Sequence, residues 1–154
     1  MGAYEVVRSA TIEAEPARIH PLIDDFHLWR EWSPWEDVDP GMQRTYTGPE
    51  AGVGAHYAWK GNRKAGEGSM EITGSAPERI DVDLAFMKPF ENKNKVTFEL
   101  RPTGAATEVT WRMQGETKGF WGVMSKVMPM DRLVGKDFEK GLSRLKSAAE
   151  HPSA

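Results

Sequence analysis

The chain has 154 residues, enough for one domain with a single hydrophobic core. Its formal net charge of −3 argues against a general nucleic-acid binder, which needs a basic face against the phosphates. The absence of cysteine excludes disulfides, thiolate metal ligands and thiol nucleophiles. No secretory signal precedes the first strand, and no apolar run reaches the roughly 20 residues of a membrane span. We therefore expect a soluble, cytoplasmic protein without stable membrane insertion.

A strand and two short helices are predicted first. Alternation over Tyr4–Ala14 favours a strand, and a helix is expected over Pro16–Asp25, where apolar residues recur at helical spacing. Pro21 falls inside this helix and predicts a kink or a break. A second short helix is expected over His27–Trp32, ending before Pro34 because the residue before a proline disfavours the α region.

From Met42 to Met113 the apolar residues recur at every second position, which is typical of strands. The pattern is interrupted by turn or breaker residues, namely Gly61–Lys64, Pro77, Pro89 and Pro102–Gly104. Six consecutive strands with short connections predict an antiparallel meander with one face in water. Together with the N-terminal strand the sheet has about seven strands, so strong curvature is expected.

Helical spacing returns after Gly119 and continues almost to the end of the chain. A first stripe contains Phe120, Val123, Met124, Val127 and Met128. A long amphipathic helix is then predicted over about Met130–Ala149, with Leu133, Val134, Phe138, Leu142 and Leu145 on its apolar face. We expect one domain over residues 1–150 and a frayed tail over 151–154.

This order of elements predicts an α+β fold whose curved seven-stranded antiparallel sheet wraps around the C-terminal helix. The two short helices after the first strand would close one end. A single helix seldom fills a strongly curved sheet, so a pocket is expected between the two. The alternative is that the bulky inward side chains pack to normal core density.

The arrangement resembles the START/Bet v 1-like helix-grip superfamily, also called SRPBCC. Within it the chain is similar to the polyketide cyclase/dehydrase and lipid-transport-like group. The resemblance spans about Val6 to Leu145, and its marks are Trp29-Arg30-Glu31-Trp32-Ser33-Pro34-Trp35, Gly52-Val53-Gly54-Ala55, Trp59-Lys60-Gly61-Asn62 with Gly66-Glu67-Gly68, and Gly135-Lys136-Asp137-Phe138-Glu139-Lys140-Gly141-Leu142.

The resemblance implies a container for a small hydrophobic or amphipathic molecule, lipid-like or polyketide-like, bound without a cofactor. Two alternatives stay open: a cyclase or dehydratase that needs no metal, and a protein-interaction module like the co-chaperone-related branch. The candidate ligand-binding residues are Trp32, Trp35, Tyr57, Trp59, Met70, Phe86, Phe98, Trp111, Met128, Leu133, Val134 and Phe138. The chain is expected to be a monomer or a homodimer.

The other groups of histidine, acidic and polar residues in the sequence favour ordinary structural roles. The histidines form no paired metal-binding motif, although His20 and His27 could share a helix face with Asp24. The strand pairs Asp81 with Asp83 and Glu67 with Glu71 are expected on the wet face of the sheet. Polar residues that could act inside a cavity are Tyr46, Tyr57, Arg112 and Asp137, with Arg112 expected to point outward and none convincingly paired.

The tryptophans of the first mark have two interpretations. Six of the residues are tryptophan, heavy use of the largest side chain, and three of them are Trp29, Trp32 and Trp35. They could form an aromatic wall for a ligand at the mouth of the pocket, or plug the wide end of the sheet.

Overall fold

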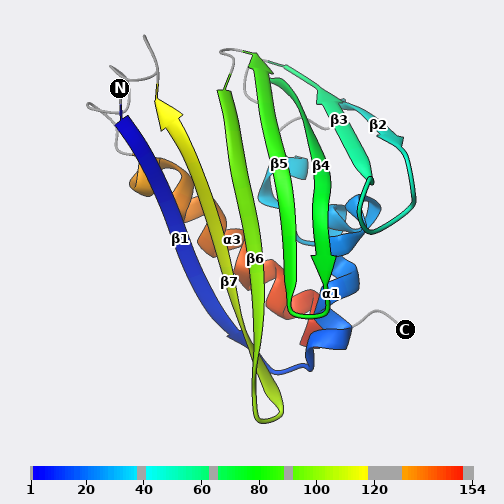
Figure 1. Cartoon of the computed structure of the whole chain (residues 1–154), viewed down its shortest axis with the longest axis vertical. Helices are drawn as coiled ribbons and strands as arrows, with labels where there is room; N and C mark the ends of the chain where they lie inside the picture. Colours follow the sequence, from blue (N-terminus) through cyan, green and yellow to red (C-terminus); the bar gives the residue numbers. More distant parts are fainter. Residues whose placement is uncertain (1, 38–40, 63–65, 89–91, 118–129, 151–154) are drawn as a thin grey trace.

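The chain forms one curved antiparallel sheet with its helices on the concave side, as Figure 1 shows. The computed structural model describes residues 2–37, 41–62, 66–88, 92–117 and 130–150. The seven strands lie in the order β1-β7-β6-β5-β4-β3-β2, all antiparallel. Their bounds are β1 Gly2–Ile12, β2 Gln43–Thr47, β3 His56–Lys60, β4 Glu67–Ala76, β5 Arg79–Lys88, β6 Asn92–Thr103 and β7 Ala106–Thr117. The predicted meander and the total of seven strands are confirmed, and β1 lies at one edge of the sheet beside β7, a position that the sequence did not predict.

Two α-helices and two 3₁₀ helices complete the described chain: α1 Pro16–Asp24, η1 Phe26–Glu31, η2 Pro34–Asp37 and α3 Met130–Glu150. The helix α3 crosses the concave side of the sheet and packs most extensively along β1 (Figure 1). The predicted C-terminal helix is therefore confirmed almost residue for residue. Within the described chain, no helix has the length and apolarity that crossing a bilayer requires.

The two short helices predicted after β1 are confirmed. The second, expected over His27–Trp32, is the 3₁₀ helix η1, and a further 3₁₀ helix, η2, was not predicted. Pro21 does not break α1, which continues to Asp24. Pro21 is the sixth residue of α1, beyond the first four amides that lack intrahelical partners, so it removes the hydrogen bond to the carbonyl of Ala17 without ending the helix.

The C-terminus of α1 explains why η1 winds tightly. The indole Nε1 of Trp29 donates to the carbonyl of Ile23 at 2.8 Å, and that of Trp32 donates to the carbonyl of Leu22, also at 2.8 Å. These carbonyls lie in the last turn of α1, where they have no intrahelical donor. The two tryptophans therefore satisfy the helix end and fold η1 back onto it, a tertiary constraint that periodicity does not reveal.

The inner face of the sheet is apolar over most of its area. Alternate residues of the central strands are almost fully buried, among them Val6, Ile72, Ile80, Val82, Val96, Phe98, Leu100, Val109, Trp111 and Met113. The helix meets this face through Phe138, whose ring stacks on that of Trp111 with centroids 4.0 Å apart and planes 6° apart. Gly141 lies beside the same indole, so the backbone of α3 comes close to the sheet.

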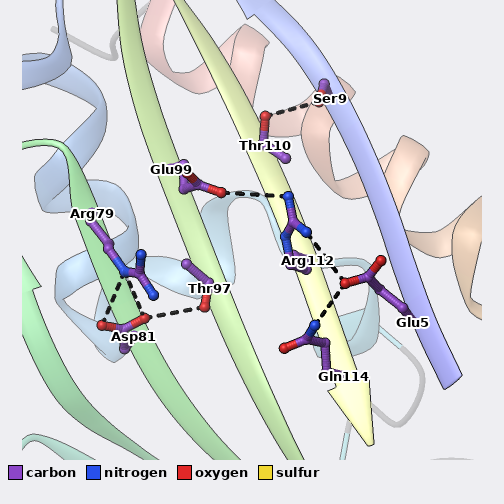
Figure 2. A network of polar contacts seen from close by, with 9 residues as sticks. All are labelled: Glu5, Ser9, Arg79, Asp81, Thr97, Glu99, Thr110, Arg112 and Gln114. Atoms are coloured by element: carbon purple, nitrogen blue, oxygen red, sulfur yellow. Dashed lines mark hydrogen bonds and ion pairs between the residues drawn. The ribbon is translucent and has the colours of Figure 1, made fainter. Parts of the chain in front are cut away.

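The outer face carries a polar network that crosses four strands, drawn in Figure 2. Arg112 contacts Glu5 on one side and Glu99 on the other, so it points outward as predicted. Asp81 accepts from Arg79 and Thr97, and Asp83 pairs with Lys95. The side chains of Asp81 and Asp83 are 35% and 49% exposed. The prediction that this carboxylate pair faces water is confirmed.

A substitution at Gly141 tests the close approach of α3. A Cβ there would lie 2.8 Å from Cζ3 of Trp111 and 3.2 Å from Cδ of Pro34. We expect Gly141→Val to lower the free energy of unfolding by about 2 kcal/mol, measured by urea denaturation. Ser143→Val is the matched control, because this exposed α3 residue should change stability by less than about 0.5 kcal/mol. Equal losses in both variants would contradict the close packing.

Candidate functional site

The site lies on the inner face of the sheet at the end opposite α1, where β3 and β5 finish (Figure 1). Strand pairing places one row of residues across this face: Tyr46, Tyr57, Met70, Leu84, Asn94 and Gly115. A second row beyond it contains Trp59, Gly68 and Phe86. Because one residue in two points inward along a strand, both rows face the concave side.

Burial decreases along this face towards the end of the sheet. On β5, Val82 is 1% exposed, whereas Leu84 and Phe86 are half-buried. On β3, Tyr57 is 3% exposed, whereas Trp59 is half-buried. We call Tyr57, Trp59, Met70, Leu84 and Phe86 the apolar floor. The helix α3 packs mainly along β1, at the opposite edge of the sheet.

The indole of Trp59 has a defined position on this floor. It is stacked beside Tyr57, with ring centroids 6.0 Å apart, and meets Phe86 edge to face at 5.8 Å. A Cβ at Gly68 would approach Cη2 of Trp59 to 2.6 Å. The absence of a side chain at Gly68 therefore makes room for the indole, which covers that glycine.

Other predicted ligand-binding residues form an aromatic cluster deeper in the fold. Trp32 and Phe98 are 0% exposed, Phe138 is 1% and Trp111 is 2%. Trp32 meets Trp111 edge to face at 5.4 Å, and Phe98 lies 5.0 Å from the same indole. These rings pack on one another. Trp35 is 37% exposed and touches Trp111 and Phe138 edge-on, so it caps the cluster from outside.

Of the remaining predicted ligand-binding residues, the structure describes the side chain of Met70 but not those of Met128, Leu133 and Val134. Met70 is 8% exposed and lies between Tyr57 and Leu84 in the first row. Met128 lies outside the described residues, as does the predicted stripe before it. Leu133 and Val134 belong to α3, but their side chains are outside the described set.

A buried ionic cluster, which the sequence did not predict, joins η2 to β2 and β3. The Glu36 carboxylate accepts from Nε of Arg44 and from the hydroxyl of Tyr57, both at 2.9 Å. The Glu36 side chain is 8% exposed and that of Arg44 is 15% exposed. The available signal was Arg44, an arginine on the inward side of an alternating strand, which requires a counter-charge.

Electrostatics around this cluster keep the tyrosines protonated. Burial, followed by the charge of Glu36 and the hydrogen bond to it, raises the pKa of Tyr57 far above its ordinary value. Burial, followed by Glu36, also raises the pKa of Tyr46, whose ring stacks on His27 at 4.0 Å. On α3, burial also raises the pKa of the Asp137 carboxyl, and the positive charge of Lys140 opposes this rise. Each oxygen of Glu36 already accepts a hydrogen bond, so the cluster holds η2 onto the sheet.

Buried polar groups are few on the inner face of the described strands. Asn94 is 4% exposed, and Thr107, at 0%, donates to the carbonyl of Ala14. The Tyr46 hydroxyl and the Trp111 indole nitrogen are buried without a hydrogen-bond partner. Two of these groups lie directly beside the apolar floor: Asn94 pairs with Leu84 across β5 and β6, and Tyr46 pairs with Tyr57 across β2 and β3.

The histidine hypothesis does not lead to a metal centre among the described residues. No three histidine, aspartate or glutamate side chains of that part converge on one point. His20 and Asp24 do meet, but through Ser75, whose hydroxyl donates to Asp24 at 2.7 Å and lies 3.4 Å from Nε2 of His20. Serine is thus the central member, whereas a catalytic relay needs histidine between serine and the acid.

The curved sheet gripping a long C-terminal helix, with short helices after β1, is the Bet v 1-like helix-grip fold. The family model described as polyketide cyclase / dehydrase and lipid transport matches residues 3–150. The chain therefore belongs to this family, within the SRPBCC group that the sequence marks indicated. No curated protein matches the sequence.

Solved structures share the architecture over nearly the whole chain. CV1439 of Chromobacterium violaceum is 15% identical, with TM-score 0.68, covering 95% of this chain and 96% of that chain. TTHA0849 of Thermus thermophilus is 17% identical, with TM-score 0.68, covering 98% and 100%. Ara h 8.0201 is 14% identical, with TM-score 0.61, covering 97% and 96%. At these identities the likeness establishes the fold.

A double-mutant cycle tests the ionic cluster. We expect Glu36→Gln and Arg44→Met to be coupled by about 2 kcal/mol in urea unfolding, because each leaves the other partner poorly solvated. The control cycle is Asp83→Asn with Lys95→Met, an ion pair whose side chains are 49% and 78% exposed. Its coupling should stay near 0.3 kcal/mol, roughly that of surface pairs. Equal couplings would contradict the assigned burial.

Alkaline unfolding tests the environment of Tyr57. Because its pKa is raised in the folded state, the contribution of this phenol to stability is complete below about pH 10, the ordinary pKa of tyrosine. It is lost as the pH rises above that value, since the unfolded chain then gains the phenolate. The free energy of unfolding should therefore fall less steeply above about pH 10 in Tyr57→Phe than in the wild type. If the free energies of unfolding of Tyr57→Phe and the wild type, measured by urea titration, fell equally with pH, the raised pKa of Tyr57 would be contradicted.

Proposed function

We propose that this protein binds a small hydrophobic or amphipathic molecule, lipid-like or polyketide-like, between its sheet and its C-terminal helix. The observation that carries the proposal is the apolar floor. On the same concave face where Val82 and Phe98 are sealed, Trp59, Leu84 and Phe86 remain half-buried. Adjacent apolar side chains that keep access to solvent gain free energy when an apolar molecule covers them.

The expected affinity follows from the area available. Covering about 300 Å² of apolar surface, ligand and protein together, is worth roughly 7 kcal/mol at about 25 cal/mol per Å². The loss of rotational and translational freedom opposes part of this gain. A dissociation constant in the range of roughly 10 μM to 1 mM is therefore expected for a ligand that only covers the floor.

The family supports the binding of a hydrophobic ligand and leaves chemistry on that ligand undecided. The buried carboxylate of Glu36 is engaged by Arg44 and Tyr57, which suits a structural role. The two alternative functions, a cyclase or dehydratase and a protein-interaction module, remain predictions from the sequence. Native mass spectrometry of the protein purified from cells tests ligand binding without assuming which molecule is bound. We expect it to detect a retained small molecule.

A matched pair of variants tests the floor with N-phenyl-1-naphthylamine, an uncharged dye that fluoresces in apolar surroundings. The inner-face substitution Phe86→Ser should weaken binding of the dye about fivefold, because the dye loses part of its apolar contact. Met87→Ser, at the next residue, changes an outward side chain that is 44% exposed and should leave affinity unchanged.

Two results would contradict the proposed function. One is a wild-type protein that binds no dye, retains no small molecule, and shows no rise in melting temperature with fatty acids or aromatic ketones. The other is equal weakening by Phe86→Ser and Met87→Ser, which would move the site away from the concave face.

A further inference from the structure

Gly68 is a buried glycine within β4, on the same face as the apolar floor. A glycine inside a strand weakens the sheet, because it costs conformational entropy and leaves no side chain to pack. The backbone conformation does not require glycine here, since Gly68 is not one of the described glycines with a positive φ. The reason for a glycine at this position is therefore the space that a side chain would occupy.

That space is occupied by the outer ring of the Trp59 indole. A Cβ at Gly68 would lie 2.6 Å from Cη2 and 2.7 Å from Cζ2 of Trp59. Trp59 on β3 and Phe86 on β5 pair with Gly68 from its two sides. Neighbouring strands lie about 4.8 Å apart, so β3 and β5 are separated by about 10 Å. The two ring centroids are only 5.8 Å apart, so the indole reaches across β4.

A β-bulge lies at the same place. The pairing of β4 with β5 shifts register between Glu67 and Gly68, so that it skips Met87, the residue after Phe86. Bulges bend a strand and re-aim its side chains, and they are common beside active sites. A strand glycine, a bulge and a tryptophan that lies across β4 therefore coincide at the end of the floor.

A side chain at position 68 would displace the indole towards the ligand. The sheet lies below the indole, the ring of Tyr57 is stacked beside it, and Phe86 meets it at the far end. The indole would therefore have to move away from the sheet, into the space above the floor. Because the floor extends over three strands, a broad ligand would lose more contact than a small one.

We propose that Gly68 determines the size of the ligand, because it lets the Trp59 indole lie against the sheet and leaves room for a broad apolar molecule, such as one with three fused rings. This inference rests on the proposed function and adds the breadth of the ligand to it. Gly68 acts through Trp59 and is therefore a positioning residue. Trp59 supplies apolar contact, and Gly68 supplies the clearance above it.

Two neutral competitors of different breadth test the inference on the full chain. They are 2-naphthol, with two fused rings, and 9-anthracenemethanol, with three. Each displaces N-phenyl-1-naphthylamine, whose affinity is first measured for every variant. The wild type should bind the three-ring compound about fivefold more tightly, because the third ring covers more apolar surface. Gly68→Ala should weaken the three-ring compound about tenfold and the two-ring compound about twofold, which abolishes the preference.

A double variant separates the indole from backbone strain. A Cβ at Gly68 would also lie 2.5 Å from the carbonyl oxygen of Ala85, a strain that is the same whatever residue stands at position 59. Phenylalanine at position 59 lacks Cζ2 and Cη2. The double variant Gly68→Ala/Trp59→Phe should therefore regain a preference of about threefold or more. Trp59→Phe alone opens the space over Gly68 and should raise the preference to about tenfold.

Gly74→Ala is the matched control on the same strand. It lies at the second register shift of β4, after Ile72, and its Cβ would lie 2.7 Å from Oδ2 of Asp81, a residue of the outer-face network. This variant should lower the urea midpoint and leave the size preference unchanged. Circular dichroism checks the folding of every variant. If Gly68→Ala does not fold, Trp59→Phe decides the question.

The outcomes distinguish this inference from the function on which it rests. If the wild type binds no dye, or neither compound displaces it, the proposed function itself fails. Three results would leave ligand binding intact and overturn the role of Gly68. They are a wild type without a size preference, a double variant as unselective as Gly68→Ala, and a Trp59→Phe variant whose preference does not rise. An equal change of preference in Gly74→Ala would also overturn it.

Discussion

The stacking of Phe138 on Trp111 fixes the position of the C-terminal helix, and the rest of the molecule is arranged around that contact. The rings lie 4.0 Å apart and nearly parallel. Gly141 permits this approach because a side chain there would run into the same indole. With the helix held against β7 and β1 in this way, its bulk lies over one edge of the sheet. Burial on the concave face then decreases towards the ends of β3 and β5, where Trp59, Leu84 and Phe86 are half-buried.

This asymmetry gives the concave face two parts with different properties. Where Trp29 and Trp32 fold back onto α1, rings contact rings and little surface remains exposed. At the ends of β3 and β5 the same alternation of apolar residues continues, but Trp59 and Phe86 keep part of their surface accessible. The first part stabilises the fold through burial, and the second offers apolar surface that a ligand can cover.

Polar groups on this face follow a consistent rule. Where a charge faces inward, as at Arg44, a carboxylate meets it, since an unpaired charge there would be costly. Where a neutral polar group is buried, as at Thr107, it donates to a backbone carbonyl, that of Ala14, which lowers the cost of its burial. The outer face differs, because Asp81 and Arg112 lie in networks that water reaches.

The sequence by itself determined the succession of strands and helices along the chain, the C-terminal helix, and which side chains face the concave side. Period-two alternation sets the face of each residue regardless of its partners, so Tyr57, Trp59 and Phe86 could be assigned inward. Only the tertiary structure decided that η1 is a 3₁₀ helix tied to α1, and that Glu36 neutralises Arg44. It also decided that Trp111 is sealed while Trp59 is not. These outcomes depend on residues far apart in the chain meeting at one point, which no local pattern records.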